Sequence, residues 1–415
     1  MEKAIETLFQ VFRKHHKQLF IVGGAVRDML LGKAPSDYDF TTDALPDEVE
    51  SWFEHTITVG KHFGTIGVIM DKKVYEITTF RKEASYADGR HPDEVLFTDD
   101  VREDVSRRDF TINGLLMDER GCVFDYVGGL EDIRNGMVRC IGDPKKRFEE
   151  DRLRKWRCIR LAAEKRMELD ERTRSAIRDN PDTAGVSIER IRGELTRIML
   201  CEKVAWGGYL LIKTELLGDL LNRMVPEYWK RCEDYLIDGF EIMGYLPKKL
   251  PLRLAAFLLN MFPEERRVFL REMRYSNKEK QLAYGFCHHV VADSQDSVAF
   301  KEALADIGME NAEDFLAFQD GLAYWDGDPS IKRVAEQNQR VYRRIAANRE
   351  PMTLRELAVN GKDLTDRGYQ GEAIKESLTR LLKRVYEYPE ENKKDRLLAW
   401  LERETHGETD LPEGN

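Results

Sequence analysis

The sequence lacks several features that would assign it to other classes of protein. No run of about 18 apolar residues occurs, so we expect no membrane-spanning helix. The six cysteines form no C-x-x-C pair, which argues against a zinc knuckle or a disulfide framework. None of the eight histidines precedes an aspartate, so nothing indicates an appended phosphohydrolase domain with a His-Asp metal pair.

Positive charge is also in short supply. The chain has 66 Lys and Arg against 76 Asp and Glu, a net charge of −10 at pH 7. A polyanion such as RNA would therefore have to bind at local cationic patches. The N-terminus lacks the basic and then apolar layout of a signal peptide, and we expect a cytoplasmic protein with no membrane partner.

The pattern of apolar residues changes along the chain. β-branched and aromatic residues predict short strands in its first third, with glycines and a short helix at 25–31 between them. From about residue 145 onward, apolar residues recur at helical spacing. We expect an α/β first third and an all-helical remainder. The predicted strands are 19–22, 38–41, 65–70, 74–80 and 115–117.

Two glycines separate the first predicted strand from the helix that follows. Gly23 and Gly24 let the backbone approach a ligand closely, and Arg27 could add a bidentate contact to an anion such as a triphosphate. The alternative is a tight turn without a ligand. The segment lacks the third glycine of a dinucleotide-binding fingerprint and the Gly-Lys-Ser/Thr of a P-loop. A dinucleotide-binding fold and a P-loop fold are therefore disfavoured.

Three carboxylates suggest a metal site. On a strand, Asp37 and Asp39 would project to the same side, and divalent cations prefer oxygen ligands. Glu76 alternates with buried positions on another predicted strand and would complete the cluster if the strands are neighbours. The alternative is an acidic turn with solvated carboxylates.

Two further segments concentrate arginine. In 107–113 (RRDFTIN), paired arginines could hold phosphate or ribose, with Asp109 orienting one of them; a charged helix end is the alternative. In 148–160 (FEEDRLRKWRCIR), one helix would align an acid and three arginines on one stripe, opposite an apolar side. That stripe is either the lining of a cleft or a solvated face. Its members are Asp151, Arg154, Arg157 and Arg160.

These segments, in this order, resemble the class II tRNA nucleotidyltransferases and bacterial poly(A) polymerases of the polymerase-β superfamily. The matching motifs are GGAVRD (23–28), SDYDFTT (36–42), YEITTFR (75–81), DGRHPDEVLF (88–97), RRDFTIN (107–113), DYVGG (125–129), IGDP (141–144), FEEDRLRKWRCIR (148–160), SIERIRGEL (187–195), VNGKDL (359–364) and GYQG (368–371). The resemblance implies an α+β fold: a polymerase-β-like catalytic head at 1–138, followed by a helical neck (139–200), body (201–340) and tail (341–407), with a frayed end at 408–415.

The resemblance also implies catalytic roles. Asp37 and Asp39 would bind two Mg²⁺ ions, and Glu76 would be the third catalytic carboxylate. Gly23, Gly24 and Arg27 would hold the triphosphate.

The remaining implied roles concern the nucleotide. Arg108 would bind it, with Asn113 in support. Asp151 and Arg154 would read the incoming base without a template, and Arg157 and Arg160 would help from the same stripe.

The sequence departs from the family pattern at three positions. Gly114, Arg152 and Leu161 stand where the family has Ala, Pro and Phe, and none of them removes a charged group. The segment 81–100 is similar to the flexible loop that accompanies addition of the terminal A, and it is full-length here.

The implied activity is template-independent addition of CCA to the 3′ end of tRNA, from CTP and ATP with release of pyrophosphate. An A-adding enzyme and a bacterial poly(A) polymerase are the alternatives, although the acidic C-terminal segment disfavours the latter. An RNA-binding protein with an inactive nucleotidyltransferase fold is disfavoured by the three retained carboxylates. The expected partner is tRNA, at its 3′ end and acceptor arm. Basic residues expected to contact its phosphates are Lys145, Lys146, Arg147, Arg190, Arg192, Lys248 and Lys249; the alternative is that each is a solvated surface charge.

Overall fold

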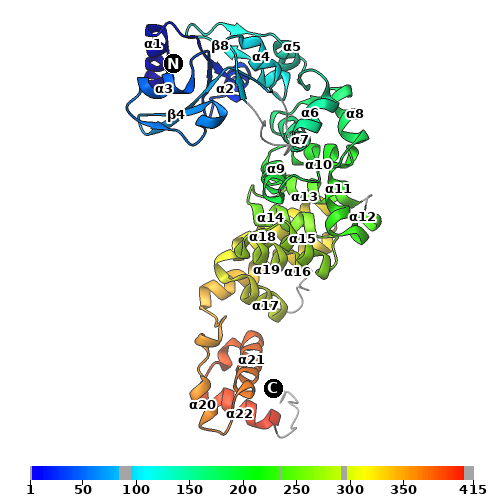
Figure 1. Ribbon diagram of the computed structural model, residues 1–415. Helices are drawn as coiled ribbons and strands as arrows, with labels where there is room; N and C mark the ends of the chain where they lie inside the picture. Colours follow the sequence, from blue (N-terminus) through cyan, green and yellow to red (C-terminus); the bar gives the residue numbers. More distant parts are fainter. Residues whose placement is uncertain (1, 84–94, 233–234, 291–296, 406–415) are drawn as a thin grey trace. The chain divides into compact units, whose positions relative to one another are not determined.

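The chain divides into two compact units, Met1–Glu233 and Asp234–Asn415. The structure, a computed structural model, describes residues 2–83, 95–232, 235–290 and 297–405 (Figure 1). Each unit is described in turn.

The first unit begins with a seven-stranded mixed sheet. All neighbouring strands are antiparallel except β2 and β5, which run parallel. The order across the sheet is β3 (Thr56–Ile57), β4 (Thr65–Met70), β5 (Lys73–Thr79), β2 (Asp39–Thr42), β1 (Leu19–Val22), β8 (Leu116–Met117) and β9 (Val123–Phe124).

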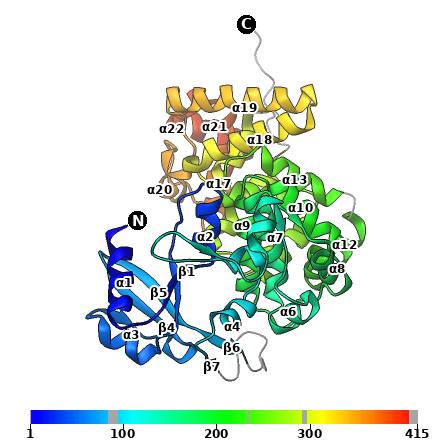
Figure 2. The same ribbon diagram turned by 90° about the horizontal axis from the view of Figure 1, so that it is seen from above.

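Helices cover both faces of this sheet. The apolar sides of α1 (Lys3–Lys14), α2 (Gly24–Leu30) and α3 (Pro46–Trp52) join one core with strand residues such as Phe40 and Ile77. Figure 2 shows α1 and α3 on the same side of β4 and β5. On the other face, α4 (Val101–Ser106) contributes Val105 to a smaller cluster.

The rest of the first unit is mainly helical. A two-stranded parallel ribbon of β10 (Met137–Val138) and β11 (Glu168–Leu169) interrupts the helices, so the expectation of an all-helical remainder was wrong at this point. Strands β6 (Arg81–Glu83) and β7 (Val95–Phe97) form a separate hairpin. The other elements are η1 (Lys61–Phe63), η2 (Thr111–Asn113), α5 (Gly129–Arg134), α6 (Pro144–Glu150), α7 (Leu153–Lys165), α8 (Glu171–Asp179), α9 (Ile188–Leu200), α10 (Val204–Lys213), α11 (Leu216–Met224) and α12 (Pro226–Cys232).

The described part of the second unit is built from helices. Its elements are α13 (Leu236–Gly244), α14 (Leu250–Leu258), α15 (Pro263–Glu272), α16 (Asn277–His288), α17 (Ser297–Ile307), η4 (Met309–Asn311), α18 (Ala312–Asp326), α19 (Pro329–Asn348), η5 (Leu354–Glu356), α20 (Gly361–Thr365), α21 (Glu372–Glu387), η6 (Pro389–Glu391) and α22 (Lys394–Thr405).

A buried charge joins α17 to α21. Lys301 is fully buried; it pairs with Glu350 at 2.7 Å and donates to the backbone carbonyl of Tyr386 at 2.6 Å. Arg344 pairs with the same carboxylate at 2.9 Å. Because an isolated buried charge is costly, these partners hold the two helices in one fixed arrangement.

The predicted α+β head and helical remainder are confirmed, and all five predicted strands form. The strand predicted at 38–41 begins one residue later, at Asp39, because its partner β1 ends where Gly23 turns away. Residues 84–94 and 406–415 lie outside the described residues. The loop prediction that depends on Tyr86, Asp88, Gly89 and Arg90, and the predicted frayed end, therefore stay predictions.

Two exclusions drawn from composition can be compared with the fold. In the described part of the chain, no helix is long and apolar enough to cross a membrane. Cys140, Cys158 and Cys287 are buried free thiols, whereas Cys122 is exposed. Burial raises the pKa of Cys140 to about 12, so this thiol stays protonated and unreactive at neutral pH.

Candidate active site

The two glycines form the turn between β1 and α2, as predicted. Gly23 has φ +74°, a conformation that L side chains rarely adopt, and it is the N-cap of α2. A Cβ on Gly23 would lie 4.0 Å from a terminal nitrogen of Arg108, and one on Gly24 would lie 3.4 Å from the guanidinium of Arg27. The turn thus presents bare backbone next to two arginines.

Arg27 is held by groups on both sides. Its Nε donates to Asp28 at 2.9 Å, and its Nη1 donates to the side-chain oxygen of Asn113 at 2.5 Å. Asn113 in turn donates to Asp109 at 3.0 Å. The structure therefore brings the glycine turn and the RRDFTIN segment together.

This network continues to α7. Asp109 forms an ion pair with Arg157 at 2.7 Å, and Asp28 pairs with Lys165 at 2.8 Å. Burial raises the pKa of Asp109, but the charge of Arg157 and the hydrogen bond from Asn113 outweigh it and lower the pKa below its usual value. Asp109 therefore orients Arg157 of α7, whereas Arg107 and Arg108 of its own segment pair with Asp104.

Arg108 is fixed by an acid that the sequence analysis did not single out. Asp104 on α4 is fully buried and pairs with Arg108 at 2.9 Å and with Arg107 at 2.6 Å. It also accepts a hydrogen bond from Thr41 on β2 at 3.1 Å. The i, i+3 and i, i+4 spacing of Asp104 to the two arginines was a usable signal for this role.

The parallel pairing of β2 and β5 makes Asp39 and Glu76 direct neighbours in register. Partial burial raises the pKa of Asp39; the negative charges of Glu76 and Asp37 raise it further, while Arg108 lowers it. Two of the three predicted carboxylates are therefore adjacent, and the charge of the third, Asp37, acts on Asp39.

The geometry of the third carboxylate differs from the prediction. Asp37 is exposed and lies in the loop before β2, so it does not share a strand face with Asp39. Within the described residues, no three His, Cys, Asp or Glu side chains gather closely enough to hold a metal ion. The expected preformed cluster of three ligands is thus absent from that part of the chain.

The single helix predicted at 148–160 is broken. α6 ends at Glu150, Asp151 has extended backbone (φ −145°, ψ 105°), and α7 starts at Leu153. The Asp151 carboxylate accepts a hydrogen bond from the Leu153 amide at 3.0 Å, which starts the second helix, and it pairs with Arg190 at 3.0 Å. Asp151 therefore lies beside α7 and not on it, and Arg190 is engaged within the protein.

The three arginines of the stripe do lie on α7, each with an acidic partner. Arg154 pairs with Glu150 at 2.5 Å and also donates to the Arg147 carbonyl at 3.1 Å. Arg160 pairs with Glu194 at 2.5 Å and with Glu164 at 2.9 Å. Arg154 and Arg160 are only 11% and 12% exposed, whereas Arg157 is 42% exposed, so two of the three arginines are shielded from solvent.

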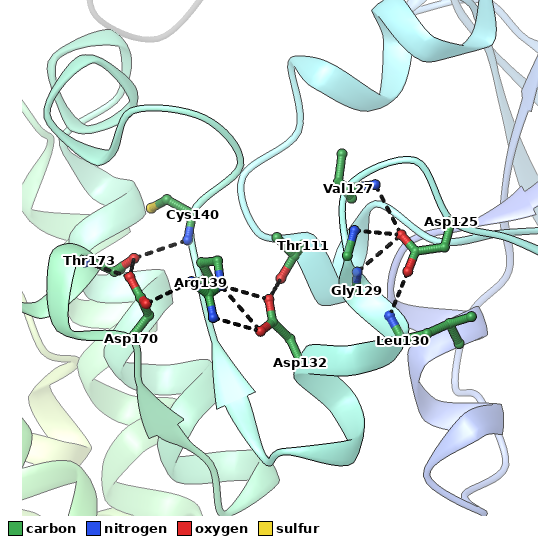
Figure 3. Close-up of polar contacts among 11 residues, drawn as sticks. Thr111, Asp125, Val127, Gly129, Leu130, Asp132, Arg139, Cys140, Asp170 and Thr173 are labelled. Atoms are coloured by element: carbon green, nitrogen blue, oxygen red, sulfur yellow. Dashed lines mark hydrogen bonds and ion pairs between the residues drawn. The ribbon is translucent and has the colours of Figure 1, made fainter.

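The segment after the sheet is fixed by a second polar network (Figure 3). Arg139 pairs with Asp132 on α5 at 3.1 Å and with Asp170, just before α8, at 2.9 Å. Asp132 also accepts a hydrogen bond from Thr111 at 2.6 Å. These contacts tie the RRDFTIN segment to the helices that follow the sheet.

The DYVGG turn has a structural role. Asp125 accepts hydrogen bonds from four successive backbone amides, residues 127–130, at 2.9 to 3.0 Å (Figure 3). A Cβ on Gly129 would lie 2.3 Å from the Thr111 carbonyl, so only glycine fits. A Cβ on Gly114 would lie 2.9 Å from Val127, which explains glycine at this departure from the family pattern.

Comparisons with known proteins agree with this arrangement. Residues 19–139 match the family described as the poly A polymerase head domain, and residues 166–230 match a probable RNA and SrmB-binding site of polymerase A. A CCA-adding enzyme from Bacillus pumilus is 33% identical over 410 residues, 95% of each chain. The chain belongs to the CCA-adding enzyme family.

Two more members of this family show how far the likeness extends. A CCA-adding enzyme from Geobacillus stearothermophilus is 34% identical over 400 residues, again 95% of each chain. The crystal structure of the Bacillus stearothermophilus CCA-adding enzyme in complex with CTP is 31% identical, covers 98% of this chain and 99% of its own, and superposes with a TM-score of 0.77. The likeness thus includes both compact units of the chain.

Proposed function

We propose that this protein adds C, C and A in turn to the 3′ end of tRNA, using CTP and ATP and releasing pyrophosphate. The observation that supports this most strongly is the 33% identity to a CCA-adding enzyme over 95% of both chains. Family members are nucleotidyltransferases, and the chain retains the glycine turn, the paired carboxylates and the arginines of α7. The predicted cytoplasmic location stays a prediction.

In this reaction the 3′-hydroxyl of the RNA attacks the α-phosphate of the nucleotide. A bond forms between that hydroxyl oxygen and the α-phosphorus, the bond from the α-phosphorus to the bridging oxygen breaks, and pyrophosphate leaves. Gly23 and Gly24 would let the triphosphate approach the backbone, while Arg27 and Arg108 neutralise its charge. Both arginines are held by carboxylates and amides, so they are oriented before the substrate arrives.

We assign Mg²⁺ as the metal, held by Asp37 and Asp39. The residues fit the ion because they offer carboxylate oxygens. Burial and then the negative charges of Glu76 and Asp37 raise the pKa of Asp39, and a bound cation would offset both effects. When bound, the metal would lower the proton affinity of the 3′-hydroxyl and neutralise charge on the phosphates. Glu76, the register neighbour of Asp39, would add a third negative charge to this site.

Asp151 and Arg154 would select the base. Cytosine and adenine both present an exocyclic amine beside a ring-nitrogen acceptor, so a carboxylate can accept from the amine while a guanidinium donates to the ring. Uracil and guanine present a carbonyl where the amine would be, and the mismatch would cost about 1–3 kcal/mol. Arg157 and Arg160 would support Arg154 from the same face of α7.

In the structure these two residues are paired with other groups. Asp151 is paired with Arg190 and Arg154 with Glu150, so base binding requires both side chains to exchange partners. We therefore assign Arg190 to positioning Asp151 rather than to gripping tRNA. The proposed division of labour is catalysis in the head (1–138), base selection in the neck (139–200) and tRNA binding by the body and tail (201–407).

The deciding experiment supplies nucleotides one at a time to tRNA ending before the first C, after C and after CC. We expect C to be added to the first two substrates and A to the third, with Mg²⁺ required throughout. Addition of A alone to tRNA ending in CC, with no C on either shorter substrate, would instead identify an A-adding enzyme. Long A tracts on any RNA would identify a poly(A) polymerase.

A further inference from the structure

A pocket of about 540 Å³ lies in the second unit, and none of its lining residues is assigned to catalysis. It is formed by α15 and α16, with Asp306 of α17 at one edge. Its volume is within the roughly 300–1,000 Å³ of pockets that hold small molecules. The lining residues that matter here are Arg267, Arg271, Lys280, Tyr284, His288 and His289.

Positive charge dominates the lining of this pocket. Three cationic side chains, Arg267, Arg271 and Lys280, line it together with one carboxylate, Asp306, which is paired with His289 at 3.0 Å. Outside the lining, Arg267 pairs with Glu264, and Arg271 pairs with Glu272 at 2.9 Å. The side-chain ammonium of Lys280 has neither a hydrogen-bond nor an ion-pair partner among the residues that the structure describes. An uncompensated cation at a concave surface attracts an anion.

The pocket also offers flat rings. Tyr284 stacks with His288, their ring centroids 5.6 Å apart at an interplanar angle of 25°. The Arg267 guanidinium lies 5.2 Å from the centroid of the Tyr284 ring and donates to its hydroxyl at 3.0 Å. Leu270, 2% exposed, adds an apolar surface to the lining. Rings with a nearby guanidinium are the groups on which nucleic-acid bases stack.

The titration of His288 agrees with this picture. Burial lowers its pKa, and the positive charges of His289 and Arg266 lower it further, whereas Asp306 raises it. The imidazole is therefore neutral at physiological pH and available for stacking, while the surrounding field is positive.

We propose that this pocket binds a nucleoside phosphate, with the base against Tyr284 and His288 and the phosphate at Lys280 and Arg271. A purely apolar ligand would leave the Lys280 ammonium unmatched, and inorganic phosphate would leave the rings and the apolar lining uncovered. A free nucleotide and a single nucleotide of bound RNA both supply this chemistry. The proposal does not depend on the catalytic assignment, because binding is measurable without turnover.

The test compares the full-length protein with two charge-reversal variants. In the pocket variant, Lys280→Glu is combined with Arg271→Glu; in the control, Lys278→Glu reverses an exposed charge on the same helix that does not line the pocket. Equilibrium dialysis with labelled ATP measures the number of nucleotides bound per chain. If the ligand is a free nucleotide, we expect two for the wild type and the control and one for the pocket variant.

Binding of tRNA that lacks its CCA end tests whether the ligand is instead a nucleotide of bound RNA. If the ligand is a nucleotide of bound RNA, the pocket variant will bind tRNA at least about tenfold more weakly than the control, with one ATP bound to every protein. Addition of C to a saturating tRNA substrate should stay unchanged in either case, so a failure here is separate from a failure of the catalytic assignment. Unchanged ATP stoichiometry together with unchanged tRNA affinity overturns the proposal, and so does an equal effect in the control.

A second variant keeps the test valid if the charge reversals unfold the protein. Tyr284→Leu removes the stacking ring but keeps an apolar side chain and all the cations. We expect Tyr284→Leu to lower the affinity for whichever ligand the charge-reversal variant affects, ATP or tRNA, by at least about fivefold. Inorganic phosphate should compete with that ligand as weakly as in the wild type. Wild-type affinity in this variant would also overturn the proposal.

Discussion

Arg190 on α9 forms an ion pair with Asp151 at 3.0 Å, across the break between α6 and α7. The two side chains are 25% and 15% exposed, so the contact is largely shielded from water and is stronger than a surface pair. The carboxylate assigned to reading the base is thus aimed by a residue from another helix.

This contact predicts a positioning role for Arg190. Without it, the Asp151 side chain loses its fixed orientation, so Arg190→Gln should lower kcat/KM for CTP and ATP by about tenfold, equivalent to about 1.4 kcal/mol. Arg190→Lys should recover part of that loss because it restores the charge. Single-nucleotide incorporation measures both. Arg178→Gln, in an exposed pair on α8, is the matched control; equal kinetics in Arg190→Gln and this control would contradict the role.

The raised pKa of Asp39 predicts that replacing this residue keeps or increases stability while activity is lost. Because its pKa is raised in the folded state, folding becomes less favourable as the pH rises through the range between the unfolded and folded pKa values. Asp39→Asn removes that cost, and its melting temperature at pH 7 should equal or exceed that of the wild type.

The same variant should lose activity by at least about a thousandfold, since it lacks the proposed metal ligand. Adding Mg²⁺ should raise the melting temperature of the wild type but have little effect on the variant. Thermal scans with and without the ion, run beside the incorporation assay, check both points. Equal stabilisation of the two proteins by Mg²⁺ would place the ion elsewhere.

Asp104 predicts a loss of stability. Asp104→Asn leaves Arg107 and Arg108 with a neutral partner in a buried site, so it should destabilise the fold by about 3–5 kcal/mol. Burial raises the pKa of Asp104, but the charges of Arg108 and then Arg107 lower it overall.

The depressed pKa also fixes the pH dependence of this effect. The stabilisation is fully present above the ordinary carboxyl pKa of about 3.9 and is lost as the pH falls through the lower folded value. The urea midpoint of the wild type should therefore exceed that of the variant by a constant amount between about pH 8 and pH 5. This difference should shrink below about pH 4, where the Asp104 carboxylate begins to be protonated. A difference that does not change with pH would exclude the carboxylate charge as its cause.

Lys301 predicts how firmly α21 is attached to α17. Lys301→Met removes the hydrogen bond to the Tyr386 carbonyl and one partner of Glu350, and should destabilise the second unit by about 3 kcal/mol. Limited proteolysis should then cut between these helices sooner. Lys383→Met, in a pair whose lysine is 59% exposed, should have almost no effect and serves as the control.

The local pattern of the sequence predicted much of this site. Strands β1 and β4 were predicted at their observed bounds because apolar runs flanked by turn residues are a local signal. The sequence predicted that Asp39 and Glu76 are close only if their two strands are neighbours, since strand order depends on contacts between distant segments. Their register required the structure.

The errors have identifiable causes. Helical spacing alone predicted that Asp151 belongs to the stripe, but aspartate is also a helix-capping residue, and its bond to the Leu153 amide breaks the helix. The two-residue strand β11 has no local pattern to reveal it, because it forms only by pairing with β10. The pair between Asp28 and Lys165 likewise joins residues far apart in the sequence.

The extended backbone at Asp151 has a mechanical consequence. Since α6 and α7 are complete on either side of this residue, rotation of its own side-chain dihedral angles can redirect the carboxylate without shifting either helix. A side chain in the middle of a helix would lack that freedom, because the neighbouring turns restrict its rotamers. In the proposed base-reading role, this freedom would let the Asp151 carboxylate adjust to cytosine and then to adenine, which differ in size.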